Sequence, residues 1–187
     1  MGWNAILGLL PFLLASILFV PKRHRNLFWA IGFILFILFL PNAPYIFTDI
    51  IHLPTDIAGF TSKRAVVAFT WQYLLLIAIG YWLFCRSYFK FENFVFAKYK
   101  IHYRVWIRII SFLIISIGVY LGRFPRFNSW DAFTKPHEII PHLITLTEPA
   151  SLAFVGLFTI LLYSAYVSYE ALHLQKEKLL ITRKIKK

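Results

Sequence analysis

The residues with the clearest chemical potential follow an apolar segment that contains its own helix breakers. Residues 41–44 read Pro-Asn-Ala-Pro, and Tyr45, Thr48, Asp49 and His52 come after them. In a helix these four side chains occupy one face, at positions i, i+3, i+4 and i+7. An imidazole beside a carboxylate can transfer protons, so His52 and Asp49 are candidate catalytic residues.

A second polar cluster, residues 122–131, reads Gly-Arg-Phe-Pro-Arg-Phe-Asn-Ser-Trp-Asp. Arg123 and Arg126 can hold a phosphate or pair with a carboxylate, because a guanidinium presents several donors in one plane. Asn128 and Trp130 suit a turn and a membrane–water interface. The possible carboxylate partners of the two arginines are Asp49, Asp56 and Asp131.

A catalytic interpretation adds Asp131 as a third candidate beside His52 and Asp49. The same three side chains could instead hold a divalent metal. A zinc-protease motif is excluded, because His137 and His142 are five residues apart and that motif needs four. The chain contains no glycine-rich phosphate loop and no nucleophile elbow, and nothing in it specifies a cofactor.

A structural interpretation explains the same residues without a ligand. Asn42 would cap a short helix that has Pro44 in its first turn and ends near Leu53, before Pro54. Asp49 and His52 would then hydrogen-bond to each other. The second cluster would have a structural role, with its arginines paired with aspartates. In a binding interpretation, the contributing residues would be Asn42, Tyr45, Thr48, Arg123, Arg126, Asn128 and Trp130.

The composition places both clusters in a membrane protein. Of the 187 residues, 59% are hydrophobic and 15% are charged, whereas a soluble domain carries about 25% charged residues. The formal net charge is +12, but the basic residues lie between and after apolar runs, so a nucleic-acid partner is not expected. Cys85 is the only cysteine, which excludes an intrachain disulfide.

The apolar runs predict a single all-α membrane domain, residues 1–187, with about five transmembrane helices. The second is broken at Pro41 and Pro44, the first is a retained span, and Arg108 in the fourth is expected to snorkel to the surface. Gly118 and Gly122 should let another helix approach closely, which would bring the two clusters together. The predicted spans are Trp3–Val20, Leu27–Phe47, Ala65–Cys85, Val105–Leu121 and Ala150–Tyr169.

The lysine and arginine counts predict the orientation. Residues 21–26, 86–104 and the basic tail 170–187 carry 14 basic residues, whereas the segments on the other side carry 5. The positive-inside rule then places the N-terminus outside, the tail in the cytoplasm and both polar clusters on the outer side. The segment Tyr88–Arg104 is predicted to be a loop or short helix in the inner headgroup layer, with lipid sensing as the alternative. The long outer loop after the fourth span should contain an interfacial helix around Pro136–Thr145.

Several motifs together resemble a bacterial membrane family, domain of unknown function 1361, over roughly residues 3–170. The resemblance implies a multi-pass protein of the bacterial cytoplasmic membrane, and it implies no activity or catalytic residue. The motifs are Trp3-Asn4 with Pro11, Pro41-Asn-Ala-Pro-Tyr45 with Thr48-Asp49 and His52-Leu53, and Leu121-Gly-Arg-Phe124 with Arg126 and Asn128-Ser-Trp-Asp131.

Three functional hypotheses follow. The favoured one is a non-catalytic membrane subunit or lipid-headgroup-binding module, whose partners are the bilayer and an anionic headgroup or another membrane protein. The alternative is an outer-leaflet enzyme acting on a lipid-linked substrate, with Asp49 and His52 as the acid–base or metal site. The third is a transporter or proton path built on the broken helix.

Overall fold

The computed structural model describes residues 2–20, 25–96 and 102–185, and most of them are helical. No β-strand occurs in these three ranges, so the predicted all-α fold is confirmed. Two 3-10 segments, Asp49–His52 and Thr145–Thr147, connect α3 to α4 and α8 to α9. The α-helices are α1 (Gly2–Leu18), α2 (Leu27–Phe39), α3 (Asn42–Thr48), α4 (Leu53–Ile57), α5 (Lys63–Phe96), α6 (His102–Arg123), α7 (Asp131–Thr134), α8 (Pro136–Ile144) and α9 (Pro149–Ile185).

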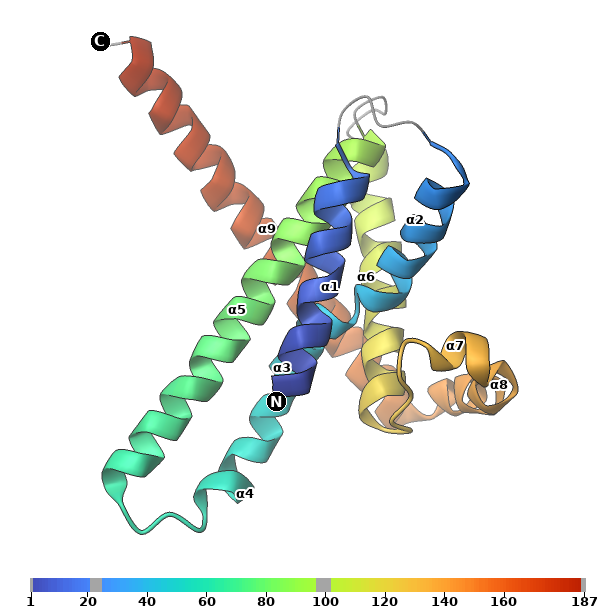
Figure 1. The fold of residues 1–187 in the computed structure, drawn as a ribbon, viewed down its shortest axis with the longest axis vertical. Coiled ribbons are helices and arrows are strands. Elements are labelled where there is room, and N and C mark those ends of the chain that lie inside the picture. Colours follow the sequence, from blue (N-terminus) through green and yellow to red (C-terminus); the bar gives the residue numbers. More distant parts are fainter. Residues whose placement is uncertain (1, 21–24, 97–101, 186–187) are drawn as a thin grey trace.

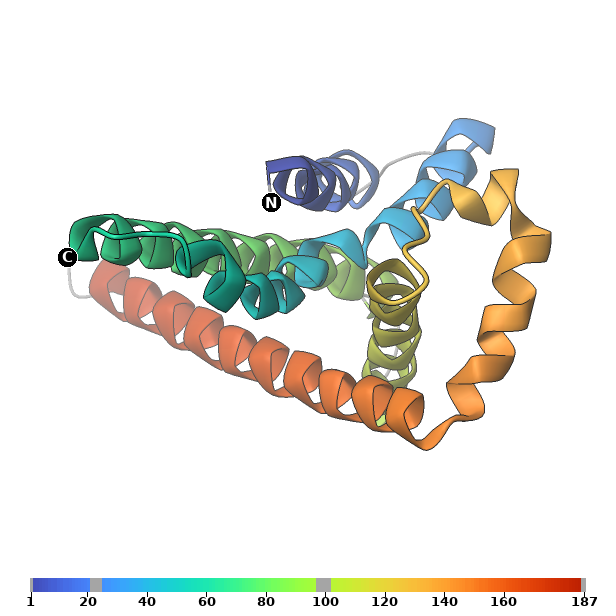
Figure 2. The ribbon, with the colours of Figure 1, turned by 90° about the horizontal axis from the view of Figure 1, so that it is seen from below.

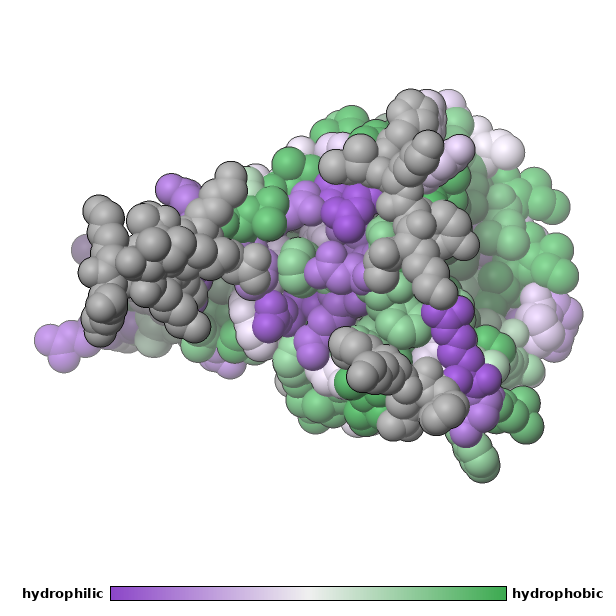
Figure 3. Space-filling view, turned by 90° about the horizontal axis from the view of Figure 1, so that it is seen from above, coloured by the Kyte–Doolittle hydropathy of each residue, from purple (hydrophilic) through white to green (hydrophobic). Residues whose placement is uncertain are grey.

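Within the described residues, four helical segments are long and apolar enough to cross a membrane. α1 is shorter, with 17 residues or about 25 Å of helix, against a hydrocarbon core of about 30 Å. Figure 3 looks onto one end of the molecule and shows hydrophilic residues near its centre with hydrophobic residues around them. The chain is therefore a helical membrane bundle. The four segments are Leu27–Ile57, Lys63–Phe96, Tyr103–Arg123 and Pro149–Lys176.

The long helices run between two ends, which Figure 1 shows at its top and bottom. α1 and α5 finish at the upper end, where α2 and α6 begin, and α4, α7 and α8 lie toward the lower end. α1 packs against α2, α3 and α5, α5 also packs against α3, and α6 packs against α9 and α3. α3 therefore lies between three helices. The fully buried aromatic rings of the core include Phe36, Phe84, Phe112 and Tyr166.

The predicted break in the second span is confirmed, because α2 ends at Phe39 and α3 begins at Asn42. Two details of the prediction are wrong. The side chain of Asn42 does not cap α3, because its amide donates to the carbonyl of Phe39 and to Ser129 instead. Pro54 does not end the helix, since α3 already ends at Thr48 and Pro54 lies in the first turn of α4, where a missing N–H is tolerated.

Glycines on the surrounding helices allow these helices to approach α3 and the break closely. A Cβ atom on Gly118 would lie 2.7 Å from Cγ of Pro41, and one on Gly122 would lie 3.2 Å from the ring of Tyr45. Both distances are shorter than ordinary van der Waals contact, so only glycine allows α6 to approach the break this closely. The predicted close approach is confirmed. The glycines around α3 are Gly8 on α1, Gly80 on α5, and Gly118 and Gly122 on α6.

The prediction that Tyr88–Arg104 forms a headgroup-layer loop or short helix is wrong for residues 88–96, which continue α5. Tyr88 and Phe91 are buried in the aromatic core, and this packing extends the helix beyond the apolar run. Residues 97–101 lie outside the described ranges.

Arg108 does not snorkel to the surface. Its side chain is 9% exposed and forms ion pairs with Glu92 and Glu170. These partners reach it because α5 and α9 both continue past the predicted ends of their spans. α9 runs to Ile185, through most of the predicted tail 170–187.

The helix predicted around residues 136–145 is confirmed as α8, and its place at the membrane interface stays a prediction. Figure 2 shows α7 and α8 extending to one side of α6 before the chain enters α9. Ile140 and Ile144 on α8 are 61% and 68% exposed, which suits a helix lying at the membrane–water interface. The second polar cluster, which ends at the start of α7, reaches the first residue of α3 through the hydrogen bond from Asn42 to Ser129.

Candidate functional site

An ion pair between Arg123, at the end of α6, and Asp49, just after α3, forms the centre of the site. Arg123 Nη1 lies 3.3 Å from Asp49 Oδ1 and donates to the hydroxyl of Tyr45 at 3.2 Å, while Nη2 donates to the carbonyl of Thr48. The guanidinium also lies over the Tyr45 ring, 5.1 Å from its centroid. The structure therefore joins the two polar clusters that the sequence separates, and it pairs Arg123 with one of its three predicted partners.

Asn4 on α1 completes the surroundings of the Asp49 carboxylate. Its amide donates to Asp49 Oδ2 at 3.0 Å, so each carboxylate oxygen has a partner. Only 4% of the Asp49 side chain is exposed. Sequence reasoning quoted Trp3-Asn4 as a family motif but assigned it no place in the site. A polar residue in the first turn of an apolar helix was the available signal.

Asn42 connects the break to the second polar cluster. Its amide donates to Ser129 Oγ at 2.8 Å as well as to the carbonyl of Phe39 at 3.0 Å. These bonds satisfy a carbonyl freed by the break, as membrane depth requires. Ser129 was not among the predicted site residues, although it stands beside Asn128 and Trp130 in the motif.

Asp131 does not join Asp49 and His52. Its Oδ2 accepts from the backbone N–H of Asn128 at 2.6 Å and its Oδ1 lies 3.4 Å from Thr134 Oγ1, so Asp131 holds its own loop. In the described residues no three histidine, cysteine or acidic side chains form a group that could hold a metal ion. The proposed metal site on these three residues is therefore wrong.

His52 lies further out on the same segment and is exposed. No hydrogen bond joins its imidazole to Asp49 or to any other group in the described part of the chain. The predicted pairing of the two residues is wrong. Both carboxylate oxygens of Asp49 already have partners in Arg123 and Asn4, so the side chain is held toward these two residues rather than toward His52.

Arg126 has unusual backbone geometry for an arginine. Its φ is 63°, and it is the only residue other than glycine with a positive φ within the described ranges. The side chain is exposed, and no acidic group of the described residues lies within ion-pair distance of it. Trp130 is 39% exposed and Asn128 is also exposed, so these two predicted binding residues remain accessible.

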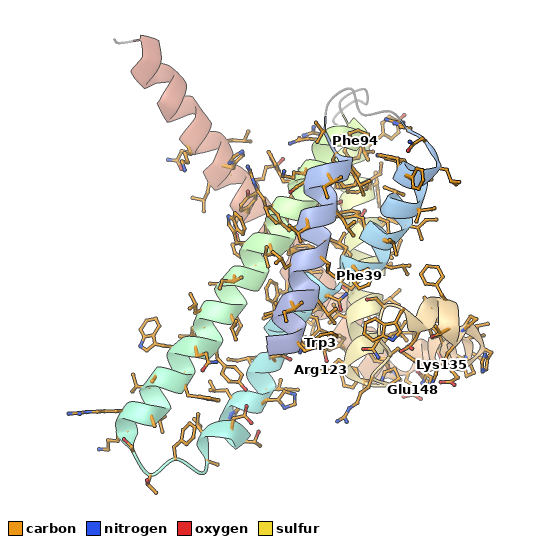
Figure 4. All side chains as sticks on the ribbon, in the orientation of Figure 1. Trp3, Phe39, Phe94, Arg123, Lys135 and Glu148 are labelled. Atoms are coloured by element: carbon orange, nitrogen blue, oxygen red, sulfur yellow. The ribbon has the colours of Figure 1, made fainter. Side chains whose placement is uncertain are left out.

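A cavity of about 820 Å³ lies against both clusters. Arg123, Arg126, Asp49 and His52 border it toward the lower end, where Figure 4 labels Arg123. Its apolar walls come from α2 and α6. Those wall residues are Ile37, Leu38, Ile114 and Ile117.

Sequence comparison identifies the family to which these motifs belong. A family model described as "Protein of unknown function (DUF1361)" matches residues 3–165, which include both polar clusters and the whole cavity lining. The chain belongs to this family. No curated protein and no solved structure matches it.

The DUF1361 chain contains a second buried polar network, at the opposite half of the bundle. Arg108 Nε and Nη2 donate to the two carboxylate oxygens of Glu92 at 2.5 and 2.9 Å, and Nη2 donates to Glu170 at 2.6 Å. The hydroxyl of Tyr166 donates to Glu92 at 2.5 Å. This network joins α5, α6 and α9. Sequence reasoning missed it, because both glutamates lie outside the predicted spans.

Proposed function

We propose that this DUF1361 protein is a non-catalytic membrane module that binds an anionic lipid headgroup beside α3 and α7. The observation that carries the proposal is a cavity bordered by two arginines whose positive charge is only partly matched by acidic partners in the described structure. Arg123 Nε is buried and has no hydrogen-bond partner in the described structure, and Arg126 has no acidic partner there. A phosphate group in the cavity would supply the acceptors that the exposed guanidinium of Arg126 lacks, and the positive charge of Arg123, which borders the same cavity, would stabilise it further.

The backbone of Arg126 supports the same proposal. A left-handed conformation costs an ordinary residue about 1–2 kcal/mol, and such strained residues occur preferentially at ligand sites. The flanking bonds hold the conformation in place: Phe127 N–H donates to the carbonyl of Leu121, and Asn128 N–H donates to Asp131. The loop therefore holds an unpaired cation at the cavity at a cost in stability.

The distribution of lysine and arginine residues supports a location of the site on the outer side of the membrane. With 14 basic residues on the opposite side and 5 on this one, the positive-inside rule favours an outer-face site in a bacterial cytoplasmic membrane. A basic cluster on the outer side runs against that rule, which favours a specific anionic ligand for it.

Replacing Arg126 with asparagine tests the proposal. Asparagine tolerates a positive φ, so Arg126→Asn removes the charge with little change to the loop. The wild-type protein, taken from micelles containing equal phosphatidylglycerol and phosphatidylcholine, should retain phosphatidylglycerol in native mass spectrometry. Arg126→Asn should lower that retention about tenfold, the effect of losing one charge-assisted hydrogen bond.

Lys135→Gln is the matched control, because Lys135 is an exposed basic residue near the site that does not border the cavity. It should leave the preference unchanged. Equal retention of the two lipids by the wild-type protein, or an equal loss in both variants, would contradict the proposal.

An outer-leaflet enzyme is the second candidate, and His52 is the observation that favours it. The imidazole borders the same cavity and has no side-chain hydrogen bond in the described structure, so it is free to transfer a proton. Turnover of a lipid-linked phosphate by the wild-type protein, lost in His52→Ala while lipid retention persists, would establish this candidate over the first.

A further inference from the structure

The apolar half of the cavity lies where two transmembrane helices fail to pack. In the described part of the chain α2 packs against α1, whereas no extended packing joins α2 to α6. Figures 1 and 2 both show α2 approaching α6 only toward the break, where Pro41 contacts Gly118. Above that contact, Ile37 and Ile114 border the cavity from opposite sides.

The wall residues lie at the depth of the membrane-spanning helices, and the cleft between them is open to the bilayer. Ile37 is 38% exposed and Ile114 is 55% exposed, on helices that are long and apolar enough to span. Ile114 precedes Arg123 by nine residues of α6, which corresponds to about 13 Å along the helix axis. An apolar cleft of that length, continuous with a cationic end, matches an amphiphile that has an anionic head and an aliphatic chain.

We propose that the site takes a phosphate-bearing lipid sideways from the bilayer, with its aliphatic chain between α2 and α6 and its phosphate at Arg126 and Arg123. This inference rests on the proposed function and adds the class of ligand and its route of entry. A water-soluble phosphate would meet the same arginines but would leave the cleft unfilled. The aliphatic chain of the lipid therefore supplies much of the binding affinity, and a soluble phosphate competes poorly with the lipid.

Tryptophan substitutions from both walls test the chain-binding cleft. Ile117→Trp on α6 and Ile37→Trp on α2 should each fill the cleft and lower retention of phosphatidylglycerol about tenfold, the effect of displacing two methylene groups from apolar contact. Ile110→Trp is the matched control, because Ile110 is 54% exposed on α6 and does not border the cavity. It should retain lipid as the wild-type protein does.

A soluble competitor separates the two possible sources of the phosphate. Glycerol 3-phosphate at millimolar concentration should displace little phosphatidylglycerol from the wild-type protein. Displacement by glycerol 3-phosphate as complete as displacement by excess lipid would overturn the inference. Unchanged lipid retention in both tryptophan variants would also overturn it, provided that their thermal unfolding midpoints match the wild type.

The outcomes distinguish this inference from the function on which it rests. If Arg126→Asn loses the lipid and the folded tryptophan variants keep it, the proposal of headgroup binding is supported. The proposal that the cleft binds the aliphatic chain is then wrong. If Arg126→Asn keeps the lipid, the proposed function itself is wrong. A native mass of two copies that Ile117→Trp reduces to one would show that a second chain fills the cleft, which also overturns the inference.

Discussion

Arg108 and Arg123 lie on the same helix, and both are about nine-tenths buried, yet their surroundings differ. Arg108 has two carboxylate partners at 2.5–2.9 Å and does not border the cavity beside α3. Arg123 has one carboxylate at 3.3 Å, an orphaned Nε and a cavity of about 820 Å³ beside it. Burial alone therefore does not distinguish a structural arginine from a ligand-binding one. An incompletely paired charge that borders a cavity does distinguish them.

The same substitution at both arginines should give the largest difference. Arg108→Gln leaves Glu92, which is fully buried, and Glu170 without a cation, so it should destabilise the protein by about 3–5 kcal/mol. Arg123→Gln should cost about 1–2 kcal/mol, because Asp49 keeps the hydrogen bond from Asn4 and borders the cavity. Unfolding titrations with sodium dodecyl sulfate, followed by tryptophan fluorescence, would measure both. Equal decreases in the free energy of unfolding would mean that Arg123 also has a mainly structural role.

A methyl group at Gly118 should have the next largest effect. Its Cβ would lie 2.7 Å from Pro41, so Gly118→Ala must push α6 from the break and should destabilise the protein by about 1–3 kcal/mol. Gly156→Ala is the matched control, since no atom lies within 4 Å of its added Cβ and alanine is the better helix former. The same unfolding titration applies. A neutral Gly118→Ala would show that the two clusters do not depend on this contact.

Arg126→Gly should have the smallest effect on stability, and in the opposite direction. Glycine adopts a φ of 63° freely, so the substitution should stabilise the protein by about 1 kcal/mol or less. The variant should also lose its preference for phosphatidylglycerol in native mass spectrometry. A variant that was destabilised, or that kept the preference, would contradict the interpretation that strain at Arg126 is maintained for binding.

The sequence predicted the site around Asp49 and Arg123 better than the network around Arg108, and the reason is physical. Pro41 and Asn42 interrupt an apolar run, and an interruption at membrane depth demands partners, so the site could be anticipated. Charge sign and sidedness made Asp49 one of three possible carboxylate partners of Arg123, and the structure shows that it is the one used. The network of Arg108 could not be anticipated from hydropathy. Its partners lie 16 and 62 residues away, in helical extensions that tertiary packing alone stabilises.

Local geometry explains the errors inside the site. Asp49 and His52 stand in a 3-10 segment, whose rise of about 2.0 Å per residue separates them by about 6 Å along the axis, against about 4.5 Å in an α-helix. Asp131 was assigned to the site by residue type, but Asn128 lies three positions before it and supplies an N–H at 2.6 Å. Short-range bonds of this kind form before any distant partner is available.

The glycines around α3 also constrain how the protein can be assembled. Asp49 is synthesised 74 residues before Arg123, and the close approach at Pro41 depends on Gly118 of the same late helix. During membrane insertion α1 can already offer Asn4 to the carboxylate, but the cation arrives only with α6. The charge pair and the α6 wall of the cavity therefore cannot form before α6 has been synthesised.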